Sequence, residues 1–340
     1  MKLEVEPIHI HTEFPFKIAR SSEQEYEVFV LSLEHEGVAG MGEAAPQPFY
    51  GESPMTVRTA VGSLGRLLDG EPETLRRSLH DRETPLGAAL AEHACVRAAL
   101  DMALWDMRGV AEGQPCHRLF GANASNTPHT SYTIGFDTPE VIDKKVDRAG
   151  EFRILKVKVG LPGDMEILDR VIERSGKKVR VDANEGWDVD MAIERTTELA
   201  QRGVEFCEQP LSHEDEEGLR TLKRLSAVPV MLDESIVNPE DVHRRYDQGH
   251  GINIKLMKCG GITPALDLIE AARAHNMTVM LGCMIETSLG ITAAAHLSPL
   301  VDYADLDGNI LLRDDPFEGV GVRDGRLVLP ETPGLGVTRR

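Results

Sequence analysis

The stretch that decides the fold opens with Lys156-Val157-Lys158 and ends at Lys255. Between these lysines, three short apolar runs each close on an acid: VRVD ends at Asp182, GVEFCE at Glu208 and VPVMLD at Asp233. The steps from one polar residue to the next are about 25 residues, enough for one strand and one helix of a parallel barrel. The even spacing indicates one functional residue in each repeated structural unit.

From about residue 127, short β-rich runs alternate with helical runs. Strands are predicted near 128–135, 153–159, 178–182, 204–208, 229–233, 251–256, 277–281 and 301–305, and helices near 138–149, 163–175, 188–202, 214–225, 239–247, 263–275 and 288–297. Eight strands with seven intervening helices favour an α/β fold with a parallel (β/α) barrel. An open doubly wound sheet is the alternative, but it would spread the polar residues along a line, whereas a barrel brings them to one mouth.

The first part of the chain has a different pattern, with strands up to about residue 50 and helices after it. The run EVFVLSL meets a turn at Glu36-Gly37. Loops are predicted at 16–22 and 46–53, and helices over 54–69, with Ser53 as N-cap, and over 86–111. Strands followed by helices indicate an α+β domain.

This change of pattern divides the chain into two predicted domains. Residues 1–125 form the α+β capping domain and residues 126–309 form the catalytic barrel. The tail, 310–340, contains a hairpin signal at Asp324-Gly325 and is expected to pack back on the first domain and complete it.

Charge and composition exclude several classes of function. The net charge is −19, which disfavours DNA, RNA and anionic membranes as partners. The five cysteines form no CxxC pair, so buried thiols in a reducing cytosol fit better than disulfides or a zinc knuckle. The N-terminus lacks the apolar core of a signal peptide, and no apolar run approaches a membrane span. A cytoplasmic protein is expected.

Asp182, Glu208 and Asp233 are expected to meet, because each ends its predicted strand and the C-terminal strand ends of a parallel barrel share one face. Three converging carboxylates repel one another unless a cation joins them. All-oxygen ligands favour Mg²⁺, with Mn²⁺ as an alternative, over Zn²⁺. Capping of the following helices is the other interpretation, but three acids at evenly spaced strand ends favour the metal.

Lys156 and Lys158 lie two apart on one strand, so both point to the same face. Crowding of like charges is expected to lower the pKa of one of them and make it a better base. Lys255, on the predicted sixth strand, lies about opposite them around the ring. Lys258 is the competing candidate, but it is expected in the loop. Simple neutralisation of the carboxylates is the alternative role for these lysines.

A divalent metal between two opposed lysines suits one type of reaction. The metal would hold a substrate carboxylate and stabilise the enediolate formed when the α-proton leaves. One lysine removes the proton from one face, and the other returns a proton to the opposite face. The outcome is racemisation or epimerisation.

The motifs KVKVG, VDANEGW, CEQP, LDES and NIKLMKCGG together resemble the muconate-lactonizing subgroup of the enolase superfamily, for which a Lys or His base with Mg²⁺ is a general pattern. The resemblance extends to FKIARSS and FYGESP near the N-terminus. It implies a modified TIM barrel, (β/α)7β, with a capping α+β domain. It also implies Mg²⁺ on Asp182, Glu208 and Asp233, catalysis by Lys158 and Lys255 with support from Lys156, and a homo-oligomer.

Asp305 and Asp307, after the predicted eighth strand, resemble the Asp-x-Asp of dipeptide epimerases, which grips the substrate ammonium. Two carboxylates two residues apart can clamp one ammonium with charge-assisted hydrogen bonds. A solvated acidic turn is the alternative. The sequence therefore predicts epimerisation of the C-terminal residue of an L-Ala-Xaa dipeptide.

The identity of Xaa depends on the capping loops. Arg20 could pair with a glutamate side chain, as in Ala-Glu epimerases, whereas Glu23, Glu25 and Glu52 could favour a basic side chain. L-Ala-D/L-Glu ranks slightly ahead. Three further residues are expected near the site: Thr133 and Glu286 as pocket lining, and Asn184 as support for the metal.

Two rival functions remain. An N-acylamino acid racemase or an o-succinylbenzoate synthase would use the same catalytic groups on a substrate without an ammonium. A non-catalytic, metal-dependent binding barrel would show no exchange of an α-proton with any carboxylate ligand.

Overall fold

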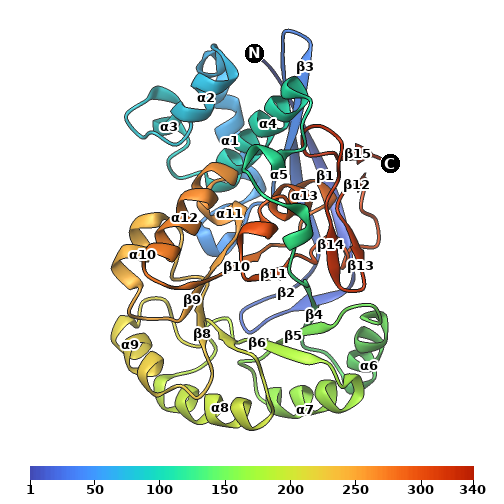
Figure 1. Cartoon of the computed structure of the whole chain (residues 1–340), viewed down its shortest axis with the longest axis vertical. Coiled ribbons are helices and arrows are strands. Elements are labelled where there is room, and N and C mark those ends of the chain that lie inside the picture. The colour runs from blue at the N-terminus through green and yellow to red at the C-terminus, as the bar shows by residue number, and fades with distance from the viewer.

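Eight parallel strands form a nearly closed barrel in the computed structural model, which describes residues 1–340 (Figure 1). The strands are β4 (Ser131–Ile134), β5 (Ile154–Lys158), β6 (Lys178–Asp182), β7 (Cys207–Glu208), β8 (Val230–Leu232), β9 (Gly251–Ile254), β10 (Thr278–Gly282) and β11 (Tyr303–Asp305). Each strand pairs with the next along the chain, and a bridge between Thr130 and Ala304 brings the last strand back to the first. The predicted barrel is confirmed, and the open doubly wound sheet is excluded.

Helices follow the first seven strands and cover the outside of the barrel (Figure 1). They are α6 (Pro139–Arg148), α7 (Asp164–Ser175), α8 (Val189–Gln201), α9 (Glu216–Leu225), α10 (Pro239–Arg245), α11 (Leu256–Cys259), α12 (Ile262–Ala274) and α13 (Ser288–Ala295), with a short 3-10 turn η4 (Ser298–Leu300) before β11. Every residue of β4 and β5 is buried, as expected for strands with barrel interior on one face and helices on the other.

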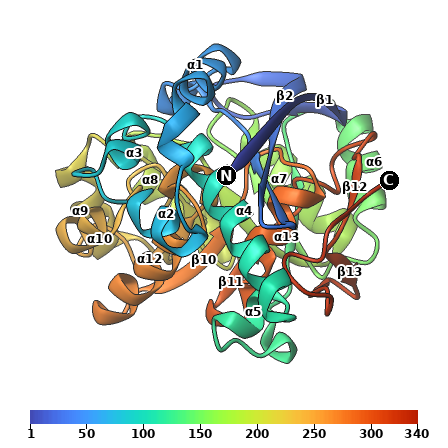
Figure 2. The same cartoon turned by 90° about the horizontal axis from the view of Figure 1, so that it is seen from above.

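A capping domain lies over one end of the barrel, as the view from above shows (Figure 2). Its antiparallel sheet consists of β1 (Lys2–Lys17), β2 (Ser22–His35) and β3 (Val38–Ala44). Its helices and turns are η1 (Pro48–Tyr50), α1 (Pro54–Leu64), η2 (Gly65–Leu68), α2 (Pro72–Ser78), α3 (Pro85–Ala89), α4 (Ala94–Glu112), α5 (Cys116–Leu119) and η3 (Ala124–Asn126). Helix α4 packs closely on β3, since a Cβ at Gly42 would lie 2.0 Å from the carbonyl oxygen of Ala99.

The tail contacts the capping domain. It contributes two small antiparallel pairs, β12 (Phe317–Glu318) with β15 (Thr338–Arg339), and β13 (Gly321–Arg323) with β14 (Arg326–Val328). The predicted hairpin at Asp324-Gly325 joins β13 to β14, with both residues at positive φ. The amide of Leu335 donates to Asp106 on α4 at 2.7 Å, which fastens the tail to the capping helix.

Three local predictions need correction. The helix expected over 54–69 ends at Leu64 and continues only as the 3-10 turn η2. The region 86–111 is not one helix, because α3 ends at Ala89 and α4 begins at Ala94. The loop expected at 16–22 is shorter, because β1 runs to Lys17 and β2 begins at Ser22. Pairing of Phe16 with Glu23 extends the hairpin toward its tip, which local composition did not reveal.

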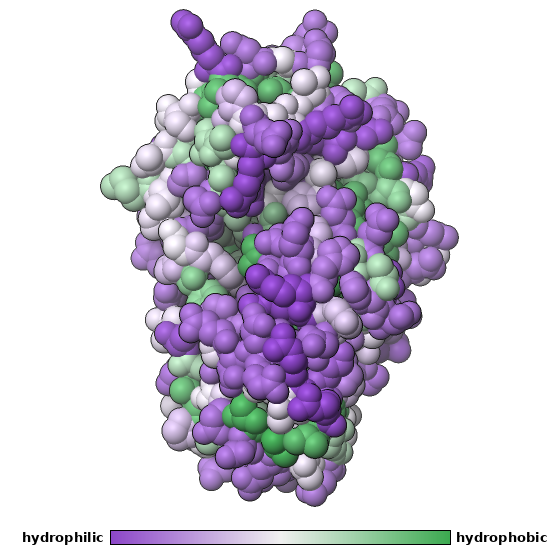
Figure 3. All heavy atoms as spheres, turned by 90° about the vertical axis from the view of Figure 1, so that its left-hand side faces the viewer, coloured by the Kyte–Doolittle hydropathy of each residue, from purple (hydrophilic) through white to green (hydrophobic).

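The face shown in Figure 3 is mostly hydrophilic, with scattered apolar residues. None of the helices has the length and apolar character needed to cross a membrane. All five cysteines are free, and four of them are buried.

Candidate active site at the mouth of the barrel

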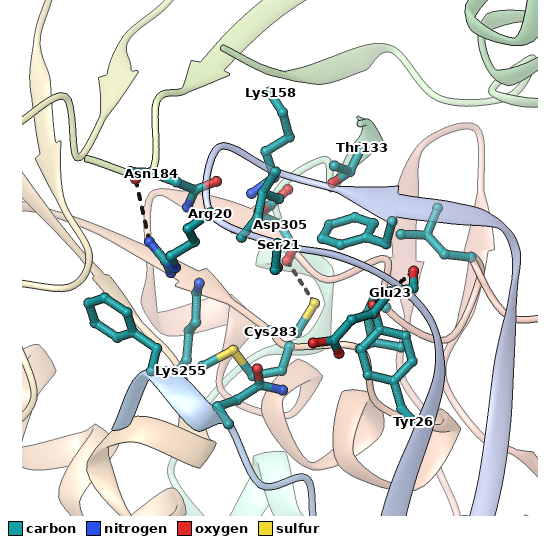
Figure 4. Close-up of a pocket in the computed structure, with 18 of the residues that line it drawn as sticks. Arg20, Ser21, Glu23, Tyr26, Thr133, Lys158, Asn184, Lys255, Cys283 and Asp305 are labelled. Atoms are coloured by element: carbon teal, nitrogen blue, oxygen red, sulfur yellow. Dashed lines mark hydrogen bonds between the residues drawn. The ribbon is translucent and has the colours of Figure 1, made fainter. Parts of the chain in front are cut away.

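A cavity of about 390 Å³ lies between the C-terminal ends of the barrel strands and the capping loops. The barrel lines it with Lys156, Lys158, Lys255, Asp305 and Asp307, among others. The capping domain closes the other side with residues of the β1–β2 hairpin and of η1. Figure 4 shows several of the lining side chains around this space, among them Lys158, Lys255 and Asp305 of the barrel domain and Arg20 and Glu23 of the capping domain.

Strand register places the first charged groups next to each other. Lys158 pairs with Asp182 across β5 and β6, and Asp182 pairs with Glu208 across β6 and β7. Asp233 directly follows β8. All three acids are fully buried, and their carboxylates contact lysine ammonium groups. None of the three lines the cavity itself.

Lys156 lies among three carboxylates. Its Nζ is 3.0 Å from Asp182 Oδ2, 2.7 Å from Glu208 Oε2 and 2.7 Å from Asp305 Oδ2. The ammonium separates these acids, and in this arrangement no group of three His, Cys, Asp or Glu side chains is set to hold a metal ion. Burial by itself would lower the pKa of Lys156, but Asp182, Asp305 and Glu208 outweigh it and raise the pKa well above the ordinary value. The expected lowering by the neighbouring lysine is therefore not found for Lys156, because carboxylates dominate its surroundings.

Lys158 and Lys255 reach the cavity from opposite sides of the barrel, since β5 is the second strand of the ring and Lys255 follows the sixth. Each forms an ion pair of 2.7 Å, Lys158 with Asp182 and Lys255 with Asp233. Burial by itself would lower the pKa of Lys255, but the charges of Asp233 and Glu208 outweigh burial, so the pKa lies above its ordinary value. Figure 4 shows Lys158 and Lys255 at different sides of the pocket.

Lys258 was expected in a loop, but it lies in the short helix α11 and is buried. Its Nζ donates to Asp233 Oδ1 at 2.7 Å, to the backbone oxygen of Asp233 at 2.5 Å and to that of Asn253 at 2.9 Å. These bonds fix the Asp233 carboxylate. Because Lys258 does not line the cavity, the preference for Lys255 as the group facing a ligand is consistent with the geometry.

Of the three acids at the ends of β6, β7 and β8, Glu208 has the fewest lysine contacts, since only Lys156 reaches it. Asn253 donates to its Oε1 at 2.7 Å, but its buried Oε2 has no hydrogen-bond partner, since the Lys156 contact lacks hydrogen-bond geometry. Burial, reinforced by the charge of Asp182, raises the pKa of Glu208 to about 8. A buried carboxylate oxygen without a hydrogen bond is costly in a folded protein unless a cation lies against it, and in this structure that cation is the Lys156 ammonium.

Two amide side chains that the sequence analysis did not single out hold these acids. Asn253 binds Glu208, and Gln209 accepts the Asp233 amide at 2.8 Å. Gln209 directly follows Glu208 in the motif CEQP, and Asn253 lies two residues before Lys255 in the motif NIKLMKCGG. This closeness in sequence to charged site residues is the signal by which Gln209 and Asn253 could have been predicted.

Asp305 and Asp307 both line the cavity but differ in their surroundings. Asp305 is engaged by Lys156, whereas Asp307 accepts only the backbone amide of Thr133, at 2.6 Å. Burial and the charge of Asp305 raise the pKa of Asp307 to about 7. The pair thus carries negative charge that Lys156 only partly offsets.

Four other residues can now be placed. Thr133 and Asn184 line the cavity, and the backbone amide of Asn184 donates to Asp182 Oδ1 at 3.0 Å. Arg20 lines it too, but lies 2.6 Å from Glu234 and 4.2 Å from the ring centre of Phe49. Glu286 does not line it, contrary to expectation, because its carboxylate turns back to accept the Met284 amide at 2.7 Å.

Two family models match consecutive parts of the chain. The family model "Mandelate racemase / muconate lactonizing enzyme, N-terminal domain" matches residues 2–121, and "Enolase C-terminal domain-like" matches residues 138–340. The chain belongs to the enolase superfamily. The resemblance to the muconate-lactonizing subgroup is confirmed.

Several members of this superfamily are similar along their whole length. The L-Ala-D/L-Glu epimerase of Bacteroides thetaiotaomicron is 36% identical, over 100% of this chain and 88% of its own. A dipeptide epimerase from Cytophaga hutchinsonii, solved with Mg and D-Ala-L-Val, superposes with a TM-score of 0.91 at 29% identity, covering 99% and 95% of the two chains. A dipeptide epimerase from Methylococcus capsulatus, solved with Mg and L-Arg-D-Lys, gives 0.90 at 33% identity, covering 99% and 98%.

Proposed function

We propose that this protein is a dipeptide epimerase that inverts the α-carbon of the C-terminal residue of an L-Ala-Xaa dipeptide. The observation that carries the proposal is the placement of Lys158 and Lys255 on opposite sides of one cavity that also contains Asp305 and Asp307. The activities by which the similar proteins are named support it.

We further propose that Asp182, Glu208 and Asp233 hold Mg²⁺. The residues fit this role because they supply only oxygen ligands, they lie at the ends of three consecutive strands, and Glu208 has a buried oxygen without a hydrogen bond. Binding would require Lys156 to move from among the carboxylates or to share them. Bound Mg²⁺ would hold the substrate carboxylate and stabilise the charge that develops as the α-proton leaves. Mn²⁺ has the same ligand preference.

The protein's own groups carry the proton transfers. With the substrate carboxylate at the acid cluster, the α-carbon lies between Lys158 and Lys255. One lysine, as a neutral amine, removes the proton from its face, and the other, as an ammonium, delivers a proton to the opposite face. Lys156 contributes a positive charge beside the substrate carboxylate.

Asp305 and Asp307 would bind the ammonium of the N-terminal residue. Asp307 suits this role because it has no cationic partner within the chain, and a bound ammonium would lower its pKa from about 7. This feature favours a dipeptide over an N-acyl substrate, which carries no cation at that position.

The choice of Xaa depends on the capping loops. Arg20 supported L-Ala-D/L-Glu in the sequence analysis, but it is already paired with Glu234. The bound ligands of the related structures include valine and lysine at the C-terminal position, so relatedness alone does not assign this side chain.

A substrate comparison tests the proposed class. The enzyme is incubated with Mg²⁺ and L-Ala-L-Xaa dipeptides, N-acetyl amino acids or o-succinylbenzoate precursors, and epimerisation and product formation are followed. We expect turnover of dipeptides only, and loss of that turnover in Asp305→Asn/Asp307→Asn. Turnover of N-acetyl amino acids by that variant at the wild-type rate would favour the racemase instead.

A further inference from the structure

Every cation that lines the active-site cavity already has a carboxylate partner. Lys156, Lys158 and Lys255 are paired with acids of the barrel, and Arg20 is paired with Glu234. Side-chain exposure is 31% for Arg20 and 0% for Glu234, so the capping loops present Arg20 as half of an internal ion pair. An incoming anionic side chain would have to compete with Glu234 for it.

Glu23, in contrast to these paired cations, is an acid of the cavity without a charged partner. It lies in the β1–β2 hairpin and lines the cavity, yet its carboxylate forms no ion pair or hydrogen bond within the chain. Only its backbone oxygen accepts a hydrogen bond from a side chain, the hydroxyl of Tyr26 at 3.5 Å. Figure 4 shows Glu23 beside Tyr26, on the capping side of the pocket.

A second chamber, of about 160 Å³, adjoins the cavity at Glu23. The two spaces share Glu23, Tyr26, Gln47, Pro48 and Ile285. The chamber adds Glu25, Glu27 and Glu52 to its lining and contains no lysine, arginine or histidine.

The three added acids have partners outside the chamber. Glu27 binds Arg58, Glu25 contacts His9 at 3.1 Å, and Glu52 accepts the Cys95 amide at 2.8 Å. Glu23, at the junction with the active-site cavity, is the carboxylate left to bind a ligand. The other acids add to the negative potential around it.

The substrate geometry directs one group toward this junction. The carboxylate of the dipeptide belongs at the acid cluster, its ammonium at Asp305 and Asp307, and its α-proton beside a lysine. The side chain of the epimerised residue is the remaining substituent, and it must extend toward the capping loops. There, Ile18 and Tyr26 offer apolar surface for a methylene stem, and Glu23 offers a charge at its end.

We propose that Glu23 makes this enzyme selective for a cationic side chain, lysine-like or arginine-like, at the epimerised position. This inference rests on the proposed dipeptide epimerase function and specifies its substrate class. It reverses the slight preference for L-Ala-D/L-Glu drawn from Arg20.

Four dipeptides test the proposal with the Mg²⁺-loaded enzyme. Deuterium uptake at the C-terminal α-carbon is measured for L-Ala-L-Lys, L-Ala-L-norleucine, L-Ala-L-Glu and L-Lys-L-Ala. Norleucine has nearly the length of lysine without its charge. We expect kcat/KM for L-Ala-L-Lys to exceed that for the norleucine dipeptide by about tenfold, the size of one partly exposed charge-assisted contact, and L-Ala-L-Glu to be the poorest.

Matched variants separate recognition of the substrate side chain from a general loss of activity. Glu23→Gln should lower kcat/KM for L-Ala-L-Lys about tenfold and leave that for L-Ala-L-norleucine unchanged. Glu23→Arg should shift the preference to L-Ala-L-Glu. Glu83→Gln removes one exposed charge elsewhere in the capping domain and should change neither value.

The contradicting outcomes are distinct. A preference for L-Ala-L-Glu or L-Lys-L-Ala, or an equal loss on all dipeptides in Glu23→Gln, would overturn the role of Glu23 while leaving the epimerase assignment intact. Absence of exchange on every L-Ala-L-Xaa dipeptide would refute the proposed function itself.

Discussion

Lys255 and Lys258 lie three residues apart, but their surroundings separate their roles. Lys255 lines the cavity and contacts Asp233 Oδ2, whereas Lys258 is enclosed and binds Asp233 Oδ1 and two backbone oxygens. Lys258 thus has all three of its donors satisfied inside the protein. We infer that it is a positioning residue that holds Asp233 for metal binding.

Substitution Lys258→Met tests that role. We expect kcat/KM to fall about 10–100-fold and the Mg²⁺ concentration at half-maximal activity to rise, because an outer group that orients a metal ligand is lost. A Mg²⁺ titration of the exchange rate measures both. Lys144→Met, at an exposed helical position, is the control. An unchanged Mg²⁺ dependence in folded Lys258→Met would contradict the positioning role.

At the scale of elements, the start of α13 joins the barrel to the capping sheet. Glu43 on β3 accepts the amides of Thr287 at 2.9 Å and Gly290 at 3.2 Å. Glu286 lies next to it, and burial together with the charge of Glu43 raises the pKa of Glu286 to about 8. Two acids are therefore buried at the interface that closes the active site.

This pair gives a prediction about pH and stability. A glutamate in an unfolded chain titrates near pH 4.3, so between about 4.3 and 8 the folded protein retains a proton on Glu286 that the unfolded chain releases. Ionisation of Glu286 in the unfolded state therefore lowers the free energy of unfolding as pH rises through this window. Glu286→Gln removes that contribution.

Urea denaturation from pH 5 to pH 8 measures the effect. We expect the stability of Glu286→Gln relative to wild type to increase steadily with pH, whereas Glu83→Gln gives a constant difference. A pH-independent difference for Glu286→Gln would show that this carboxyl titrates alike in the folded and unfolded chains.

Element-level patterns explain how much of the site was predictable. Parallel strands end at one mouth, so the positions of Lys156, Asp182, Glu208 and Asp233 followed from the sequence alone. Contacts between distant segments did not follow, because periodicity identifies a buried face but not its partner. The bond between Lys156 and Asp305 spans 149 residues, and Arg20 meets Glu234 across the domain boundary. Glu286 lies beyond the end of β10, where packing rather than strand geometry sets its direction.

At the scale of the whole molecule, the proposed Mg²⁺ site at the acid cluster would link metal binding to folding. A ligand that binds only the folded chain stabilises it, by about 2.7 kcal/mol at a hundred times its dissociation constant. We therefore expect Mg²⁺ added to chelator-treated protein to raise its Tm, and Glu208→Gln to reduce that rise. Differential scanning calorimetry with Glu83→Gln as control measures both. An equal rise in Glu208→Gln and wild type would place the Mg²⁺ effect away from Glu208.

The central claim is that Lys158 and Lys255 exchange protons with one α-carbon from opposite faces. It is tested most directly by deuterium uptake in D2O with Mg²⁺, using both epimers of one accepted dipeptide and the variants Lys158→Ala and Lys255→Ala. We predict that each variant loses epimerisation, and that Lys158→Ala exchanges the α-proton of one epimer only while Lys255→Ala exchanges that of the other. Epimerisation that persists in either variant, or loss of exchange from the same epimer in both, would contradict the two-base account.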